Sequence, residues 1–284
     1  MTTLILVTAA AAGGYLLLSI AVTYLVQQFP RRPLEDPPDW GRVEDARIAT
    51  VGGGLLEVWR IEPEGPSHGI VVFAHGWGRN RDRMVPRARL FARWGYTVVI
   101  HSARDHGGSS PKCCMNAARF AEDIEAVLDW VGRPVILYGH SAGSAGAIIA
   151  ADHRPHDVRL LFLEGVYADT KEALKRLYYW FNPLFGLAFA NLIVFWMDLF
   201  YSGRLKDYSP EQIAPRIQVP VMLIHGEKDG RFPPSYAERV RRRLPHDNTS
   251  LYIAPGVGHS DASLTPGYSA AVKAFLERWD LRVR

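Results

Sequence analysis

Three polar residues far apart in the chain, Ser141, Asp229 and His259, have the types and the order that acyl transfer requires. A serine hydroxyl is a weak nucleophile that needs a base within hydrogen-bond reach, and the base needs a carboxylate to fix its tautomer and stabilise the imidazolium. Ser141 is the centre of Gly139-His140-Ser141-Ala142-Gly143, a G-x-S-x-G sequence. An apolar run precedes this sequence and a helical segment follows it, which predicts a nucleophile elbow with the serine on a sharp turn.

Other carboxylates compete with Asp229 for the role of the triad acid. Asp229 comes just after the predicted strand 221–225, so we expect it at a carboxyl strand end, where parallel sheets place their active sites. Glu164 also ends a predicted strand and stays an alternative. Glu227 is a second alternative, although strand alternation predicts that it points away from the site. Two further acids are expected to serve other purposes: Asp105, which would brace the end of the sheet, and Asp261, which is too close in sequence to His259.

Acyl transfer also requires donors for the developing oxyanion. In the strand–turn–helix context of an elbow, one donor is the backbone N–H after the nucleophile, here Ala142, and the other comes from the loop after the third strand. Trp77, in His75-Gly76-Trp77-Gly78, is the candidate for that second donor. Each such donor stabilises the transition state by roughly 3 kcal/mol.

Over residues 46–284, predicted buried strands alternate with helical segments. This alternation predicts the fold that positions the candidate catalytic residues. The predicted strands cover residues 47–51, 55–61, 70–74, 96–100, 135–138, 160–163, 221–225 and 251–253. The predicted helices cover residues 86–94, 118–130, 142–153, 236–244 and 268–279. Continuous apolar strands that alternate with helices indicate a mostly parallel sheet covered on both faces.

These motifs resemble those of the α/β-hydrolases, over about 85% of the chain. Within that superfamily the chain is similar to the membrane-anchored serine hydrolases grouped with serine-aminopeptidase, lysophospholipase and monoacylglycerol-lipase relatives. The resemblance is carried by His75-Gly76-Trp77-Gly78, the elbow, residues 225–229, Gly258-His259-Ser260 and residues 104–109. It implies an eight-stranded α/β-hydrolase sheet and a small helical cap at about residues 166–212. The family's usual R-G-H-G-x-S is replaced here by Arg104-Asp105-His106-Gly107-Gly108-Ser109, a change in a supporting loop that leaves the triad intact.

The N-terminal region predicts a membrane anchor over residues 1–28. Leu4 to Val26 carries no charge and is long enough to span the roughly 30 Å hydrocarbon core. A cleaved signal peptide is the alternative, but the run is too long and its start too weakly charged for one. Residues 29–45 are rich in Pro, Arg and acidic residues and are interpreted as a linker. Because basic residues follow the span and none precedes it, we expect a single-pass protein with the catalytic domain in the cytoplasm.

The apolar segment 174–201 interrupts the alternation of strands and helices. Polar residues within it make a second membrane span a weaker interpretation than a cap over the sheet. Its large apolar side chains are expected to be buried, exposed to lipid or in contact with an acyl chain. We expect substrate contacts from Phe185, Phe189 and Trp196.

Composition and the absence of certain motifs narrow the classes of function that the sequence allows. The net charge of +4 does not by itself imply a nucleic-acid partner, and the aromatic residues are not interleaved with charges as in a single-strand binder. The two cysteines, Cys113 and Cys114, are adjacent, which argues against a disulfide framework or a cysteine-based zinc site. No motif for a metal or cofactor is present, so none is expected. The six arginines between residues 79 and 93 are interpreted as a solvated helix face, with lipid phosphates as the alternative partner.

Together these features predict a membrane-anchored serine hydrolase that cleaves a carboxylic ester, such as a lipid ester, through an acyl-enzyme. No obligate protein partner is indicated. A thioesterase, a peptidase and an acyltransferase would use the same triad and stay open. A non-catalytic membrane scaffold is the alternative from another class, and the intact triad argues against it.

Overall fold

All eight predicted strands are present and form one sheet in the computed structural model, which describes residues 1–279. The strand order is β1-β2-β4-β3-β5-β6-β7-β8. The β1–β2 and β2–β4 pairs are antiparallel, and the other neighbouring pairs are parallel. The strands are β1 (Arg42–Thr50), β2 (Gly54–Glu62), β3 (Ile70–Ala74), β4 (Thr97–His101), β5 (Val135–His140), β6 (Val158–Glu164), β7 (Val221–Gly226) and β8 (Thr249–Ala254). This arrangement confirms the predicted mostly parallel eight-stranded sheet.

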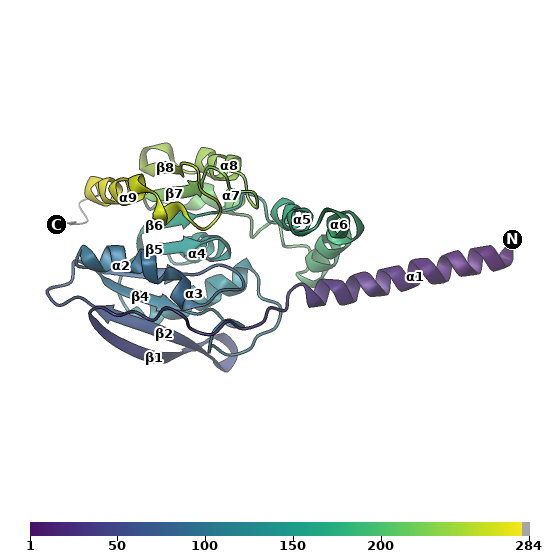
Figure 1. Cartoon of the computed structure of the whole chain (residues 1–284), viewed down its shortest axis with the longest axis horizontal. Coiled ribbons are helices and arrows are strands. Elements are labelled where there is room, and N and C mark those ends of the chain that lie inside the picture. The colour runs from purple at the N-terminus through teal and green to yellow at the C-terminus, as the bar shows by residue number, and fades with distance from the viewer. Residues whose placement is uncertain (280–284) are drawn as a thin grey trace.

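Helices cover both faces of this sheet (Figure 1). Those that form the body of the protein with the sheet are α2 (Val85–Arg93), α3 (Ala117–Val131), α4 (Ala142–His153), α7 (Pro210–Ile213), α8 (Ser235–Arg243) and α9 (Pro266–Arg278). Side chains of α2 and α9 pack on one face, and those of α3, α4 and α8 pack on the other. Successive residues of a strand point to opposite faces, so Val71 and Phe73 of β3 face α2 while Val72 and Ala74 face α4. Both kinds of position must then be apolar, which explains the continuous apolar runs.

Local sequence signals set the helix ends that matter for the site. The side chain of Asn116 caps α3 by accepting a hydrogen bond from the backbone N–H of Arg119, and Gly132 ends the helix in a left-handed conformation. In residues 170–200, which we call the cap, Asn182 accepts from the N–H of Phe185, and Pro183 occupies the first turn of the next helix. The Asn182-Pro183 pair therefore divides the apolar segment into two helices.

Three helices lie outside the body. They are α1 (Thr2–Leu25), α5 (Thr170–Phe181) and α6 (Pro183–Phe200). Figure 1 shows α5 and α6 side by side at one end of the sheet, with α1 passing α6 and extending away from the body. Among the described residues, α1 and α6 are the two helices that are long and apolar enough to cross a membrane, a test that core helices and signal sequences also pass.

One face of α1 packs against α6 through both polar and apolar side chains. The indole Nε1 of Trp196 donates a hydrogen bond of 2.8 Å to Oγ of Ser19. The Tyr201 hydroxyl lies 3.4 Å from Oε1 of Gln27, and Tyr15 places its ring 5.7 Å from that of Phe189. The rest of α1 is largely exposed and apolar. The N-terminal helix is thus fastened to the cap along a single side.

A buried ion pair links α2 to the end of β6. The guanidinium of Arg87 makes two hydrogen bonds to the Glu164 carboxylate, and both side chains are almost fully buried. Burial alone would raise the pKa of Glu164, but Arg87 outweighs it and lowers the pKa to about 2. Arg87 also donates to the backbone carbonyl of Ser260 at 2.9 Å, and the Tyr138 hydroxyl donates to Glu164 at 2.6 Å. The pair therefore joins α2, β5, β6 and the loop after β8.

We expect Arg87→Met to lower the free energy of unfolding by about 3–5 kcal/mol, because it leaves the buried Glu164 carboxylate without its counter-charge. Adding Glu164→Gln should recover most of that loss, since no unpaired charge remains. Because the Glu164 pKa is depressed, the contribution should be complete above pH about 4.5 and disappear as the pH falls towards 2. Urea unfolding at several pH values measures these changes.

The control is Arg89→Met on the same helix. Arg89 pairs with the exposed Asp39 at 2.6 Å, so its loss should cost less than about 1 kcal/mol. Equal stability losses for Arg87→Met and Arg89→Met would contradict the importance of the buried pair.

Candidate active site

Ser141 occupies the turn between β5 and α4 in a conformation that serine rarely adopts. Its φ is 56° and its ψ is −118°. Two flanking glycines make the turn possible: a Cβ on Gly139 would lie 2.4 Å from the carbonyl oxygen of Gly143, and one on Gly143 would lie 2.4 Å from that of Ala74. Because no larger residue fits at either position, the G-x-S-x-G spacing follows from close packing of the turn on β3.

The structure brings the three predicted triad residues together. Nε2 of His259 lies 2.9 Å from Oγ of Ser141, and its Nδ1 lies 2.6 Å from Oδ2 of Asp229. His259 is reached from the loop after β8, and Asp229 from the loop after β7. A proton on Nδ1 would be held by the carboxylate, which leaves Nε2 free to accept the serine proton.

The surroundings of Asp229 keep its carboxylate charged. Oδ1 accepts hydrogen bonds from the backbone N–H groups of Arg231 at 2.9 Å and Phe232 at 3.0 Å. Nε2 of His225 lies 3.2 Å from Oδ2. Burial raises the pKa of Asp229, but the hydrogen bonds from His225, His259 and the backbone outweigh burial and lower it below the usual range. The group facing His259 is therefore an anion.

The rival carboxylates have other partners. Glu164 is paired with Arg87, and its backbone carbonyl, not its carboxylate, faces the elbow, where it accepts from the N–H of Ser141 at 2.8 Å. Glu227 accepts from the backbone N–H of Gly256 at 2.7 Å. Asp105 accepts from the backbone N–H of Lys112, also at 2.7 Å. The acceptor for Nδ1 of His259 is thus Asp229 and none of these three side chains.

The two predicted oxyanion donors come from two turns that meet at the serine. Ala142 begins α4, and Trp77 follows Gly76, whose Cβ, if it had one, would lie 3.0 Å from Cβ of Ser141. Trp77 and Ala142 both pack against the same small cluster of Ala103, Met115 and Phe120. Within residues 1–279, neither of their backbone N–H groups donates a hydrogen bond to another part of the protein. Both N–H groups are therefore free of protein partners in this part of the chain, and their role as oxyanion donors stays a prediction.

Two further residues support the histidine loop and were not expected from the sequence. Nε2 of the buried His140 lies 3.3 Å from the backbone carbonyl of His259, and Arg87 holds the next carbonyl, that of Ser260. Burial lowers the pKa of His140 to about 3, so the imidazole is neutral and can donate one proton to that carbonyl. The only sequence signal was indirect: His140 lies inside the elbow, and Arg87 is in the arginine-rich run.

That run was interpreted as a solvated face, and this is wrong for two of its members. Arg87 is buried against Glu164, and Arg81 is buried between Asp45 and the ring of Trp59, 3.8 Å from the ring centroid. A guanidinium can be buried when its donors find fixed acceptors and its flat face stacks on an aromatic ring. Charge counting along the sequence does not reveal such partners.

The three predicted acyl-binding residues contact the cap itself and α1. Phe185 packs against Tyr178 and Phe181, and Phe189 packs against Phe185 and Tyr15. Trp196 reaches Ser19 through its indole N–H. These contacts show that the three side chains pack against the cap and α1. A role for them in substrate binding stays a prediction.

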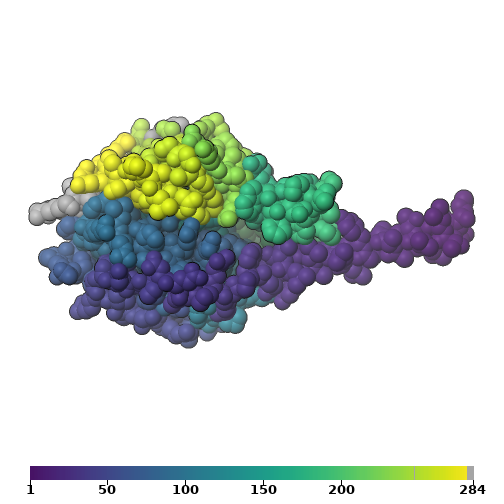
Figure 2. Space-filling view, viewed as in Figure 1, coloured from purple at the N-terminus to yellow at the C-terminus, as the bar shows by residue number. Residues whose placement is uncertain are grey.

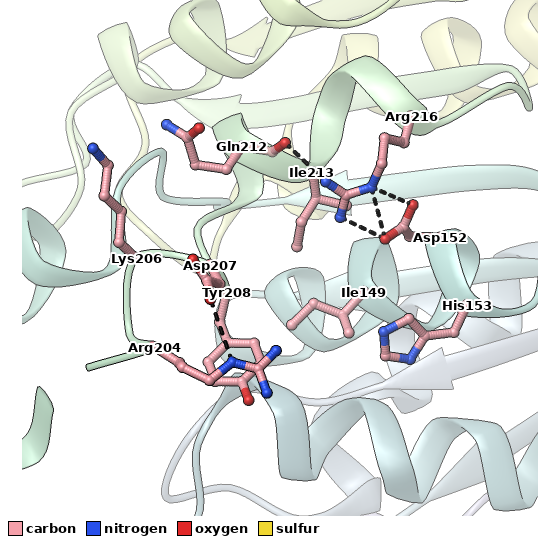
Figure 3. A pocket seen from close by; sticks show the side chains of 10 residues that line it. All are labelled: Ile149, Asp152, His153, Arg204, Lys206, Asp207, Tyr208, Gln212, Ile213 and Arg216. Carbon is pink, nitrogen blue, oxygen red and sulfur yellow. Dashed lines mark hydrogen bonds and ion pairs between the residues drawn. The ribbon is translucent and has the colours of Figure 1, made fainter. Parts of the chain in front are cut away.

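A cavity of about 550 Å³ lies away from the serine. It is lined by the C-terminal end of α4, by the loop after α6 and by the segment around α7, as Figure 3 shows. Four of its charged side chains form two pairs: Arg216 bonds to Asp152, and Arg204 lies 3.3 Å from Asp207. Asp152 is 11 residues from Ser141 along α4, or roughly 16 Å at 1.5 Å per residue. This cavity is therefore separate from the serine site.

Among the described residues, no group of three or more histidine, cysteine or acidic side chains is arranged to hold a metal ion.

Comparisons with known proteins identify the family of the chain. Residues 65–209 match the family model described as serine aminopeptidase, S33. The chain is 22% identical to the monoacylglycerol lipase of Mycolicibacterium smegmatis, over 75% of this chain and 88% of the relative. It is 28% identical to the bifunctional esterase/perhydrolase of Acinetobacter calcoaceticus, over 67% of this chain and 84% of the relative.

Solved structures show the same fold. An esterase of Pyrococcus furiosus superposes with a TM-score of 0.70 at 21% identity, over 89% of this chain and 99% of the esterase. A membrane phospholipase A superposes with a TM-score of 0.63 at 20% identity, over 98% of both chains. The predicted fold class and family resemblance are both confirmed. The chain belongs to the S33 serine aminopeptidase family of the α/β-hydrolase superfamily.

Proposed function

We propose that the protein hydrolyses a carboxylic ester through an acyl-enzyme on Ser141. The observation that carries the proposal is the continuous set of contacts from Ser141 Oγ through His259 to Asp229 on a strained turn. His259 takes the serine proton as Oγ attacks the ester carbonyl, and returns it to the leaving alcohol. Water then attacks the acyl-enzyme by the same route in reverse.

In this proposal the oxyanion is held by the backbone N–H groups of Trp77 and Ala142. Both groups are free of other hydrogen bonds within residues 1–279, and Ala142 and Gly76, the residue before Trp77, adjoin the serine. Donors fixed before the reaction stabilise the transition state without reorganisation, which is why such groups matter most when their geometry is rigid.

The substrate class that we propose is an ester with an apolar acyl chain. The cap exposes several large apolar side chains beside the apolar α1, including Leu184, which is 77% exposed, and Leu187, which is 72% exposed. Apolar surface of this extent marks an interaction with lipid or an apolar ligand. Relatives named as a monoacylglycerol lipase and esterases are consistent with such a substrate.

We further propose that α1 anchors the protein in a membrane, with the hydrolase on the cytoplasmic side. The helix is 24 residues long and without charge, and basic residues follow it at positions 31 and 32. The likeness to a membrane phospholipase A covers 98% of this chain and therefore includes α1. Such an anchor would keep the hydrolase close to lipid substrates.

Ser141→Ala should abolish ester turnover and labelling by a fluorophosphonate probe while leaving the unfolding temperature unchanged. Asp229→Asn should lower kcat by about 10⁴-fold, as loss of the orienting carboxylate does in other Ser-His-Asp enzymes. The matched control is Glu227→Gln, two residues away, whose side chain only holds the N–H of Gly256. Turnover by a folded Ser141→Ala protein, or equal losses for the two carboxylate variants, would contradict the assignment.

Turnover should increase with acyl chain length in a series of soluble esters. Polar substitutions at Phe185, Phe189 or Trp196 should reduce long-chain turnover more than acetyl-ester turnover if these side chains contact the acyl group. Equal losses on all esters would assign the three residues to packing against α1 alone. If the unaltered protein shows no preference for long chains, the proposed lipid substrate is wrong.

Deletion of residues 1–28 should yield a soluble protein that retains activity on a short ester. The physical reason is that the hydrolase body has its own core on both sheet faces, and α1 contacts mainly the cap. Membrane flotation of the full chain and the shortened chain measures the effect. Retention of the shortened chain on membranes would identify α6 as a second membrane contact.

A further inference from the structure

The segment between α1 and β1 lies along the surface of the hydrolase body. Figure 2 shows this dark purple part of the chain continuing from α1 across the front of the molecule. Residues 29–35, which we call the strap, contact residues 76–82, which we call the oxyanion loop because they include Trp77. The contacts are both apolar and polar, so the strap is an ordered part of the enzyme surface.

Phe29 covers the turn that follows Trp77. Its ring lies 5.6 Å from the indole ring of Trp77 in an edge-to-face arrangement. Gly78 has a φ of +67°, and a Cβ at this position would lie 3.3 Å from the Phe29 ring. The ring therefore packs directly on the glycine backbone and leaves the turn little space to move outward.

Hydrogen bonds hold the two segments together. Nε of Arg32 donates to the backbone carbonyl of Gly78 at 3.0 Å. In return, Nδ2 of Asn80 donates to the backbone carbonyls of Arg32 at 3.1 Å and Pro33 at 2.9 Å. Asn80 is only 1% exposed, so its amide depends on the strap for these acceptors. The backbone N–H of Glu35 adds a hydrogen bond of 2.8 Å to the Asp82 carboxylate.

The other side of the same turn is held by His106. The backbone N–H of Gly78 donates to Nε2 of His106 at 3.0 Å, and Nδ1 of His106 lies 2.8 Å from the carbonyl of Arg104. Burial lowers the pKa of His106, which favours the neutral ring that can accept from Gly78. Arg31 of the strap binds the loop that carries His106. It donates hydrogen bonds of 3.0 Å to the carbonyl of Gly107 and 2.6 Å to that of Ser109.

We propose that the strap positions the oxyanion loop, with Phe29 and Arg32 acting as positioning residues that fix the direction of the Trp77 N–H. Gly78 is held through its N–H by His106 and through its carbonyl by Arg32, which restricts rotation of the peptide units next to Trp77. This inference rests on the proposed function, because it assigns the Trp77 N–H to the oxyanion.

The expected effect is partial. Complete loss of an oxyanion donor costs about 10²–10³-fold in kcat. The strap only orients the donor, so we expect Phe29→Ala and Arg32→Met each to lower kcat for a short soluble ester by about 10-fold, with little change in KM. The affinity for a trifluoromethyl ketone, whose oxyanion would occupy the same site, should fall by the same factor as kcat.

The experiment uses the full-length chain in detergent micelles. Arg32→Lys retains a donor and should recover part of the activity lost in Arg32→Met. Leu34→Ala is the matched apolar control. Leu34 lies in the strap and is 41% exposed, against 48% for Phe29, but it is not one of the residues that we propose hold the oxyanion loop. The unfolding temperature is measured for each variant, so that a stability loss is separated from a catalytic one.

Unchanged kcat and inhibitor affinity in Phe29→Ala and Arg32→Met would overturn the proposal, as would a lower unfolding temperature with unchanged activity of the folded fraction. Failure of the proposed function gives a different result, since Ser141→Ala would then remain active. An inactive Ser141→Ala protein together with fully active strap variants would reject the strap alone.

Discussion

The buried ion pair of Arg87 and Glu164 joins the parts of the chain that must meet for catalysis. The Glu164 backbone carbonyl accepts from the N–H of Ser141 and from Oγ of Ser144, while its carboxylate binds Arg87. Arg87 in turn holds the carbonyl of Ser260, next to the triad histidine. A charge buried in this way is costly unless its partner is fixed, so the pair ties the elbow and the histidine loop to one arrangement.

Much of this arrangement could be predicted from the sequence, because its determinants are local. The buried strands appear as continuous apolar runs, since side chains on both faces of a parallel sheet are covered. The elbow could be recognised because the approach of Gly139 and Gly143 to neighbouring backbone excludes any larger residue. Asp229 and His259 follow the ends of strands, where their side chains converge on the serine.

Other contacts could not be predicted because their partners are distant in sequence and many are backbone groups. Residues 29–45 have the composition of a linker, yet Arg32 binds the carbonyl of Gly78 and Asn80 binds two carbonyls of the strap. Because every residue has a backbone carbonyl, the residue type does not show which carbonyl will accept a hydrogen bond. The same holds for Trp196, whose large apolar ring suggests substrate contact, whereas its N–H meets Ser19.

The polar side of α1 has a consequence for the placement of the whole enzyme. Ser19, Thr23 and Gln27 are spaced four residues apart and so lie on one side of the helix, the side that meets Trp196 and Tyr201 of the cap. In a bilayer, a helix with one polar side and other sides of hydrocarbon has a single favourable rotation about its axis. If α1 spans a membrane as proposed, the cap that packs on that side takes one fixed direction around the helix axis. The orientation of the whole molecule about the α1 axis would then be fixed by the contact between α1 and the cap.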